Sequence, residues 1–252
     1  MRMFASLIFN LLFYSLTVLL VILFLPLLLL PVSLLRLPVW LWAGGTQLLL
    51  RLVLASGHRI RGQMPKHPVI YAAKHQSAWE TIILYARLGY PAPVLKQELL
   101  FLPLFGLYLL RLETIPINRQ AGLQAMRELM KNAAAMAARG KSILIFPQGT
   151  RVAAGADHPY HPGTFAIYQA TGLPVVPIAL NAGLVWPRNA FMKTPGIIDV
   201  ELLPEIEPGL DRRQFMKRLE NAIETATDRL PGMAEARRRL NANSRQTQPS
   251  GD

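Results

Sequence analysis

The sequence predicts an α/β protein with a mainly parallel sheet covered by helices, preceded by a hydrophobic helical segment that anchors the chain to a membrane. Two observations predict this arrangement. After Gly62, short apolar runs with strand character alternate with helical segments, which is typical of parallel sheets. Before Gly62 lies most of the apolar excess that raises the hydrophobic content to 52% of 252 residues, against 17% charged residues.

The amino-terminal segment carries no charged residue over residues 3–35. As one helix it would be roughly 50 Å long, which exceeds the roughly 30 Å hydrocarbon core of a bilayer. Pro26 and Pro31 are expected to kink or end this helix. A cleaved signal peptide is disfavoured, because the apolar region is too long and no A-x-A site follows it.

A second apolar stretch, residues 37–55, contains two tryptophans, the residue type favoured at bilayer interfaces. We therefore expect residues 1–55 to be membrane-anchoring helices, which either span the bilayer or lie as a hairpin in one leaflet. More arginines follow the first apolar stretch than precede it, so the positive-inside rule predicts that the rest of the chain is cytoplasmic. Those that follow are Arg36, Arg51, Arg59 and Arg61, and only Arg2 precedes.

Residues 56–230 are expected to form one folded domain. Its strands are predicted at residues 68–73, 92–95, 114–117, 142–146 and 174–180. Its helices are predicted at residues 77–88, 98–110, 121–138, 163–170 and 211–230. The composition then becomes polar, and residues 231–252 are predicted to be a disordered tail.

The formal net charge of +12 favours an anionic partner, such as a lipid headgroup, a nucleic acid or a phosphorylated substrate. The chain has no cysteine, which excludes a disulfide framework, a thiolate metal site and a cysteine nucleophile.

Three polar clusters follow predicted strands, at residues 74–80, 118–119 and 147–151. Ligands of open parallel sheets bind beyond the carboxyl ends of the strands. The clusters would bring a histidine, two arginines and a glycine turn to one edge of the sheet. That edge suits a phosphorylated substrate with an exchangeable proton.

The first cluster contains Ser77 and Glu80 at the spacing of a capping box, with Ser77 as N-cap and Glu80 at N3. His75 lies just before the helix start. A back-folded Glu80 would accept a hydrogen bond from the imidazole, fix its tautomer and stabilise its protonated form. The alternative is that Glu80 only caps the helix and His75 is an incidental loop residue.

In the third cluster, Gly149 exposes backbone N–H groups and Arg151 supplies a forked cation, and both suit phosphate oxygens. Such a segment is also an ordinary turn, and Arg119 alone would be a surface charge. The order and placement of the three clusters favour a site.

Taken together, these residues resemble the 1-acylglycerol-3-phosphate acyltransferases of the glycerolipid acyltransferase superfamily. The resemblance covers residues 57–205. In chain order, the family motifs H-x-x-x-x-D, K-x-E-L-x-x-x-P-x-x-G, I-x-R, F-P-E-G-T-R and V-P-I/V are similar to residues 75–80, 96–106, 117–119, 146–151 and 176–178. Two positions depart from the family. Glu80 stands in place of an aspartate, and Gln148 in place of a glutamate, which removes a charge near Arg151.

The resemblance implies transfer of a fatty acyl group to the sn-2 hydroxyl of 1-acylglycerol-3-phosphate (lysophosphatidic acid), giving phosphatidic acid in phospholipid synthesis. The donor would be an acyl carrier protein or coenzyme A thioester, with no metal and no other cofactor. It implies that His75, paired with Glu80, removes the hydroxyl proton. The residues implied to bind substrate are Lys96, Arg119, Gly149, Thr150 and Arg151.

The expected partners are therefore lysophosphatidic acid, the acyl thioester and membrane lipids, and not nucleic acid. The expected location is the cytoplasmic membrane of a bacterium, with the catalytic domain, residues 56–230, on the cytoplasmic side. The apolar helix near residues 99–110 is expected either to line an acyl-chain groove or to lie in the core.

Three alternatives stay open. The acceptor could be another lyso-lipid, such as lyso-ornithine lipid or a lysophospholipid, because these enzymes share the motifs. A membrane-tethered protein that binds nucleic acid or another anionic ligand would need basic residues interleaved with aromatics on one surface, whereas here the basic residues are spread. A serine hydrolase built on Ser77 would lack the G-x-S-x-G elbow.

Overall fold

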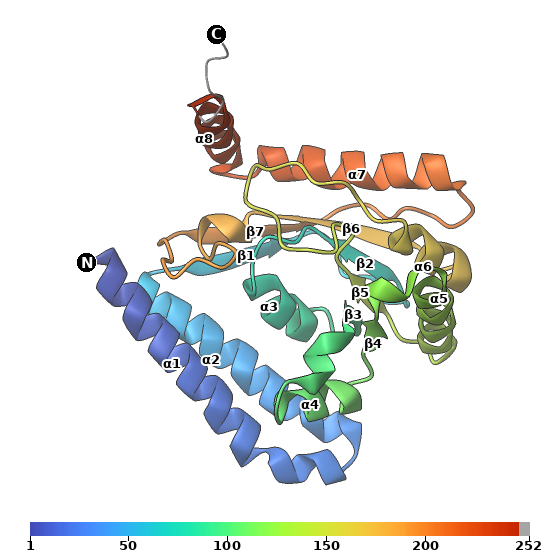
Figure 1. Ribbon diagram of the computed structural model, residues 1–252, viewed down its shortest axis with the longest axis horizontal. Helices are drawn as coiled ribbons and strands as arrows, with labels where there is room; N and C mark the ends of the chain where they lie inside the picture. The colour runs from blue at the N-terminus through green and yellow to red at the C-terminus, as the bar shows by residue number, and fades with distance from the viewer. Residues whose placement is uncertain (247–252) are drawn as a thin grey trace.

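The computed structural model describes residues 1–246, which form a seven-stranded sheet with helices on both faces (Figure 1). The strand order is β1-β7-β6-β2-β5-β3-β4, and β6–β7 is the one antiparallel pair among these strands. The strands are β1 (Gly57–Arg61), β2 (Ile70–Ala73), β3 (Ala92–Lys96), β4 (Ile115–Ile117), β5 (Ile143–Ile145), β6 (Val175–Leu180) and β7 (Ile197–Leu202). The predicted fold class is confirmed.

The central strand β2 is apolar at every position because both faces of the sheet are covered. Successive side chains of a strand point to opposite faces. Tyr71 and Ala73 therefore join the core beneath α3 and the amino-terminal helices, whereas Ile70 and Ala72 join the opposite core. The helices against that second face are α5 (Gly122–Ala138), α6 (Gly163–Thr171) and α7 (Arg212–Arg229).

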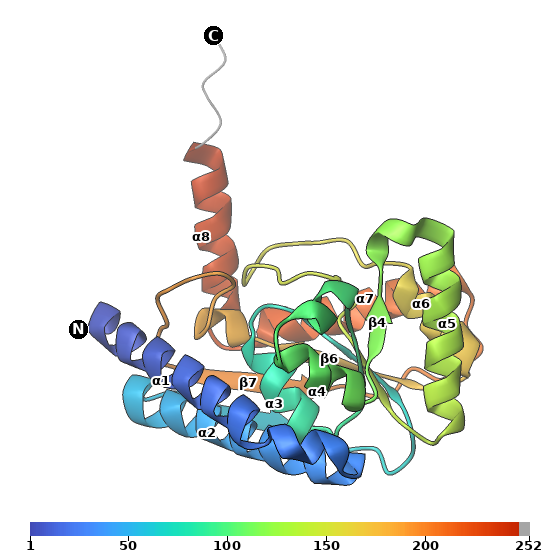
Figure 2. The same cartoon turned by 60° about the horizontal axis from the view of Figure 1, so that its bottom comes forward.

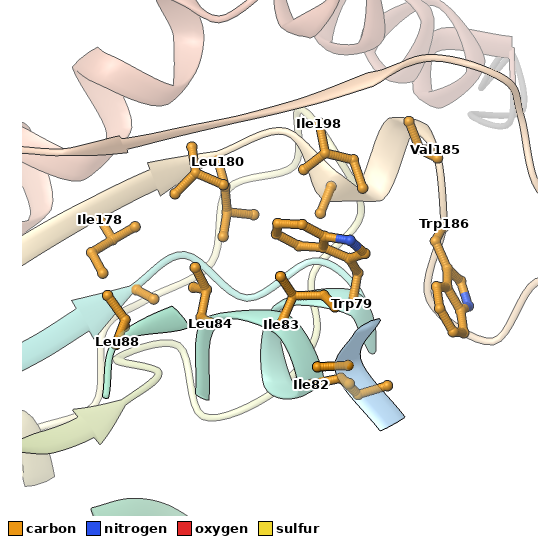
Figure 3. Packing of buried hydrophobic residues seen from close by; sticks show 14 of the residues in the cluster. Trp79, Ile82, Ile83, Leu84, Leu88, Ile178, Leu180, Val185, Trp186 and Ile198 are labelled. Atoms are coloured by element: carbon orange, nitrogen blue, oxygen red, sulfur yellow. The ribbon is translucent and has the colours of Figure 1, made fainter. Parts of the chain in front are cut away.

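Helix α3 (Trp79–Arg87) is fixed by the fully buried Trp79. The indole lies among apolar side chains of α3, β6 and β7 (Figure 3). Its Nε1 donates a hydrogen bond to Gln47 Oε1 on α2, at 3.1 Å. This packing holds the start of α3 at the end of β2.

The amino-terminal helices α1 (Arg2–Leu23) and α2 (Arg36–Leu54) lie side by side as a hairpin (Figures 1 and 2). Helix α1 ends shortly before Pro26, as expected. The 3-10 turns η1 (Leu25–Leu29) and η2 (Val32–Leu35) make the connection. Two segments are long and apolar enough to cross a membrane, and most of their residues are not buried. They are α1, with a mean hydropathy of 2.4, and Val32–Leu54, which joins η2 to α2 and has a mean hydropathy of 1.3.

The helix predicted over residues 98–110 is wrong in its continuity. The chain instead forms a 3-10 turn, η3 (Gln97–Phe101), followed by the short helix α4 (Phe105–Arg111). Pro103 lacks an N–H for a helical hydrogen bond, and Leu104 has a φ of 58°, which a helix does not accommodate.

The edge strand β1 and its neighbour β7 were not predicted. Strand β1 is short and carries three basic side chains, so it has no apolar alternation to reveal it. Asp199 of β7 accepts hydrogen bonds from Arg59 and Arg61 of β1, at 3.2 and 3.4 Å. Pairing across 140 residues is a tertiary contact that local sequence does not show.

The prediction of a disordered tail over residues 231–252 is wrong where helix α8 (Met233–Gln246) forms. Helix α8 projects from the body of the protein (Figure 2). Arg237 ties its first turns to Asp157 and Asp228, at 3.0 and 3.1 Å. Residues 247–252 lie outside the described part of the chain.

Candidate active site

The three predicted clusters meet at the carboxyl edge of the parallel strands, in a cavity of about 840 Å³. His75 follows β2, Lys96 ends β3, Arg119 follows β4, and the 147–151 segment follows β5. Because these strands are parallel, their ends coincide in space. The predicted residues that line this cavity are His75, Lys96, Arg119, Gly149, Thr150 and Arg151.

Glu80 lies behind His75. Its Oε1 is 2.9 Å from His75 Nδ1 and also accepts the backbone N–H groups of Gln76 and Ser77, at 2.7 and 2.6 Å. The Glu80 side chain is fully buried, whereas His75 is 13% exposed. Since Nδ1 donates to the carboxylate, Nε2 is the ring nitrogen left with a lone pair.

The predicted capping box is half formed. Helix α3 has Ala78 as its N-cap, and Ser77 Oγ accepts from the N–H of Trp79 at 3.1 Å, so Ser77 is not the N-cap. The reach of Glu80 back to the N–H of Ser77 is present as predicted. One carboxylate therefore both secures the helix start and holds the imidazole.

Two residues contact His75 in ways that were not predicted from the sequence. The Phe146 ring stacks on the imidazole with centroids 4.1 Å apart. Gln148 is buried, and its Oε1 accepts the backbone N–H of His75 at 3.2 Å. The position where this chain departs from the family motif thus contacts the backbone of the histidine, where the sequence associated it with Arg151.

Gly149 has a φ of 64°, a region that favours glycine. A Cβ there would lie 2.7 Å from His161 Cδ2 and 3.5 Å from Arg119 Cζ. The missing side chain therefore lets His161 and Arg119 close over the turn.

Two further basic residues that line the cavity, His161 and Arg188, were not predicted from the sequence. Arg188 Nη1 donates to the carbonyl oxygen of Arg151 at 2.6 Å. Burial, Arg119 and His158 lower the pKa of His161 below its usual value, so this ring is mainly neutral near pH 7. Both residues lie in irregular loops, where no periodic pattern marks them. Arg188 and the predicted cations form a cationic rim of Lys96, Arg119, Arg151 and Arg188, and the neutral His161 lies among them.

The remainder of the cavity is apolar and extends to the amino-terminal hairpin. Helices α1 and α2 contribute Leu20, Val21, Val39 and Trp42 to its wall. Helix α4 contributes Phe105, Tyr108 and Leu109. The expectation of a groove near residues 99–110 therefore agrees with this wall, although Leu104 and Leu107 are exposed and are not among the lining residues.

Behind the other face of β2 lies a buried ion pair. Lys74, next to His75, is buried, and its Nζ is 2.6 and 2.5 Å from the two carboxylate oxygens of Glu224 on α7. Tyr160 donates to the same carboxylate at 2.8 Å. Burial and Glu224 raise the pKa of Tyr160, which keeps the phenol protonated. Helix α7 and the loop before α6 are thus fastened to the residue beside the histidine.

These features define an α/β enzyme whose cavity contains a histidine backed by a buried carboxylate, and this cavity suits a substrate with an anionic head and an apolar tail. The amino-terminal helices that complete this cavity are apolar enough for a membrane.

Comparison with known proteins agrees with this class of enzyme. The acyltransferase family matches residues 57–181. A 1-acyl-sn-glycerol-3-phosphate acyltransferase of Pseudomonas aeruginosa is 37% identical over 171 residues, which cover 67% of this chain and 66% of that protein. A lyso-ornithine lipid O-acyltransferase of the same organism is 26% identical over 186 residues, covering 67% and 71%. The chain belongs to the acyltransferase family, and the family resemblance seen in the sequence is confirmed.

A solved structure supports the fold. The crystal structure of the 1-acyl-sn-glycerophosphate (LPA) acyltransferase PlsC from Thermotoga maritima matches with a TM-score of 0.68 at 19% identity. The match covers 92% of this chain and 99% of that one.

Proposed function

We propose that this protein is a 1-acylglycerol-3-phosphate O-acyltransferase that converts lysophosphatidic acid and an acyl thioester to phosphatidic acid. The observation that carries the proposal is the position of His75, backed by Glu80, where a cationic rim meets an apolar cavity. A phosphate head on the rim and an acyl chain in the apolar part would place the glycerol between them, beside the imidazole. The name of the 37% identical relative supports this substrate.

In the proposed reaction, His75 Nε2 accepts the proton of the sn-2 hydroxyl as its oxygen bonds to the thioester carbonyl carbon. The carbon–sulfur bond then breaks, and the proton on His75 passes to the leaving thiolate. Between these steps the imidazole is positively charged, and the Glu80 carboxylate 2.9 Å away stabilises it. The acyl thioester, of acyl carrier protein or coenzyme A, is the only co-substrate.

The charge of the rim favours a phosphate-bearing acceptor. Arg119 and Arg151 present guanidinium groups, which bind phosphate through paired hydrogen bonds. A lyso-ornithine lipid carries an ammonium group as well as a carboxylate, so its headgroup has no net negative charge to match a rim that is already positive. Lysophosphatidic acid is therefore the preferred acceptor of the two lipids on which related proteins act.

The contacts of α1 support a hairpin within one leaflet. Near its start, Ser6 Oγ accepts the N–H of Lys193 at 3.0 Å. Near its end, the carbonyl oxygen of Val21 accepts from the Tyr108 hydroxyl at 2.8 Å. A helix held to the catalytic body at both ends lies along that body. We place the hairpin in the cytoplasmic leaflet of the cell membrane, by the positive-inside rule.

The test uses purified protein with lysophosphatidic acid or lyso-ornithine lipid, and acyl carrier protein and coenzyme A thioesters of several chain lengths. Lipid mass spectrometry should show phosphatidic acid as the main product, with the His75→Ala protein giving the background. If only lyso-ornithine lipid is acylated, the acceptor is lyso-ornithine lipid and not lysophosphatidic acid. No acylated product from either lipid with any thioester would contradict it.

A further inference from the structure

The loop over residues 186–196, between η5 (Ala182–Leu184) and β7, lies beside the amino-terminal half of α1 (Figure 1). It exposes two adjacent large apolar side chains. Phe191 is 50% exposed and Met192 is 41% exposed. Single exposed apolar residues are common on protein surfaces. Whether this pair marks a contact surface therefore depends on the residues around it.

The loop is held in shape from within by Lys193. This side chain is buried, and its Nζ donates to the carbonyl oxygens of Ala190 and Phe191, at 3.0 and 3.1 Å. The ammonium also lies over the rings of Phe9 and Trp186, 6.0 and 5.5 Å from their centroids. The loop therefore bonds its backbone carbonyl groups to a buried lysine and leaves the side chains of Phe191 and Met192 exposed.

The loop is continuous with the apolar outer surface of α1. Asn10 Nδ2 donates to the carbonyl oxygen of Phe191 at 3.2 Å, and the N–H of Lys193 donates to Ser6 Oγ at 3.0 Å. Between and beside these contacts, α1 exposes Phe4, Leu7 and Leu11. Phe191 and Met192 extend this exposed apolar surface beyond the helix.

The same loop reaches the active site. Arg188 and Asn189 line the cavity, and Arg188 donates to the carbonyl oxygen of Arg151. Only two residues therefore separate a cavity-lining cation from an exposed phenylalanine.

We propose that the 186–196 loop is a membrane-contact element in addition to the hairpin. Phe191 and Met192 insert into the lipid surface on which α1 rests, and Arg188 is thereby held at the level of the lipid headgroups. We identify the partner as a lipid surface for two reasons. The pair continues the exposed apolar surface of α1, and the cation Arg188 lies between the pair and the cavity. The part of Arg188 in receiving an anionic lipid head rests on the proposed function, whereas the lipid contact does not.

The chain has no cysteine, so a single introduced cysteine can be labelled selectively. A nitroxide would be attached to Met192→Cys in the full-length protein on vesicles of phosphatidylethanolamine and phosphatidylglycerol. The matched control is Met64→Cys, because Met64 is 45% exposed on the loop between β1 and β2. Relaxation by oxygen reports an apolar surrounding, and relaxation by a water-soluble nickel chelate reports an aqueous one.

The label at residue 192 should be relaxed more by oxygen and less by nickel than the label at residue 64. Equal accessibility to nickel at both positions would overturn the proposal. Protection at residue 192 from both reagents would also overturn it, since that result indicates a protein partner such as a second copy. None of these outcomes depends on enzymatic activity, so they are independent of the proposed function.

An activity measurement follows from the same contact. The double variant Phe191→Ser and Met192→Ser should acylate lysophosphatidic acid embedded in vesicles about tenfold more slowly, because two apolar side chains no longer hold the site at the surface. Its rate with a short-chain, water-soluble lysophosphatidic acid should be unchanged. Equal losses with both acceptors would contradict a role in reaching the membrane.

Discussion

The His75–Glu80 pair and the cationic rim share one cavity but are built in opposite ways. Glu80 is fully buried, and three N–H donors converge on its Oε1. Lys96, Arg119 and Arg188 are exposed, so water hydrates them until a ligand arrives. In the proposed reaction, the pair would stabilise a charge that exists only during turnover, whereas the rim would bind a charge that the substrate brings. Substitutions in the pair should change turnover, and substitutions in the rim should change the Michaelis constant.

The largest effect is expected for His75→Ala. Loss of the general base should lower turnover by at least the ~10²-fold typical of such residues, with little change in melting temperature. His67→Ala is the matched control, since His67 is exposed and pairs with Glu205. Near-normal turnover of a folded His75→Ala protein would show that another group takes the proton.

Glu80→Gln separates capping from charge. The glutamine oxygen can still accept the N–H groups of Gln76 and Ser77, but it offers no negative charge to the imidazolium. Turnover should fall about tenfold, since a hydrogen bond to a charged group is worth about 1 kcal/mol more than a neutral one.

The Michaelis constants of both substrates should change little in Glu80→Gln, and Glu80→Asp should keep more activity because aspartate retains the negative charge. A fully active and stable Glu80→Gln protein would mean that Glu80 serves only the helix start.

Arg151→Lys tests the rim. Lysine keeps the charge but loses the planar fork that binds phosphate, so the Michaelis constant for lysophosphatidic acid should rise roughly tenfold. The constant for the thioester should change less. Arg127→Lys, on the exposed side of α5, is the control. If both constants rise equally, Arg151 does not distinguish the two substrates.

The apolar part of the cavity should set chain length. Leu109→Trp fills space beside α4, and its preference among acyl donors should shift several-fold toward shorter chains. Leu107→Trp on the same helix is the control, because Leu107 is exposed and is not among the lining residues. Uniform loss of activity together with a lower melting temperature would place Leu109 in the packing of the core instead.

The smallest effect concerns acid stability. Burial lowers the pKa of both His58 and His161 in the folded protein, with Arg87 adding to the first and Arg119 and His158 to the second. As pH falls below 6.5, the unfolded chain binds these protons first, so the free energy of unfolding decreases. His161→Gln should make the melting temperature slightly less dependent on pH between neutrality and pH 5. An unchanged pH dependence would show that this histidine is too exposed to contribute.

Much of the candidate site could be predicted because it follows parallel strands. β2, β3, β4 and β5 end at one edge, so the polar residues after each of them had to converge. The link between His75 and Glu80 was predictable for a local reason, since five residues across a helix start bring the two side chains together.

The rest depends on contacts that local patterns do not encode. His161 and Arg188 enter the cavity from loops, where the packing of His161 over Gly149 and the bond from Arg188 to Arg151 are tertiary contacts. Ser77 was misplaced as N-cap because α3 begins at Trp79, whose indole packs in the core and fixes the first turn. Strand β7 lies between β6, the strand before it in sequence, and β1, which is about 140 residues away in sequence.

The ion pair between Lys74 and Glu224 limits how far this protein can be shortened. The segment that matches the family ends at residue 181, before β7 and α7. A chain cut there would remove Glu224 together with α7, the helix whose carboxylate pairs with the buried Lys74 next to His75. It would also remove β7, the strand that joins β1 to the sheet. The segment that matches the family is therefore smaller than the unit that must fold together, and we expect a minimal active version to extend through Arg229.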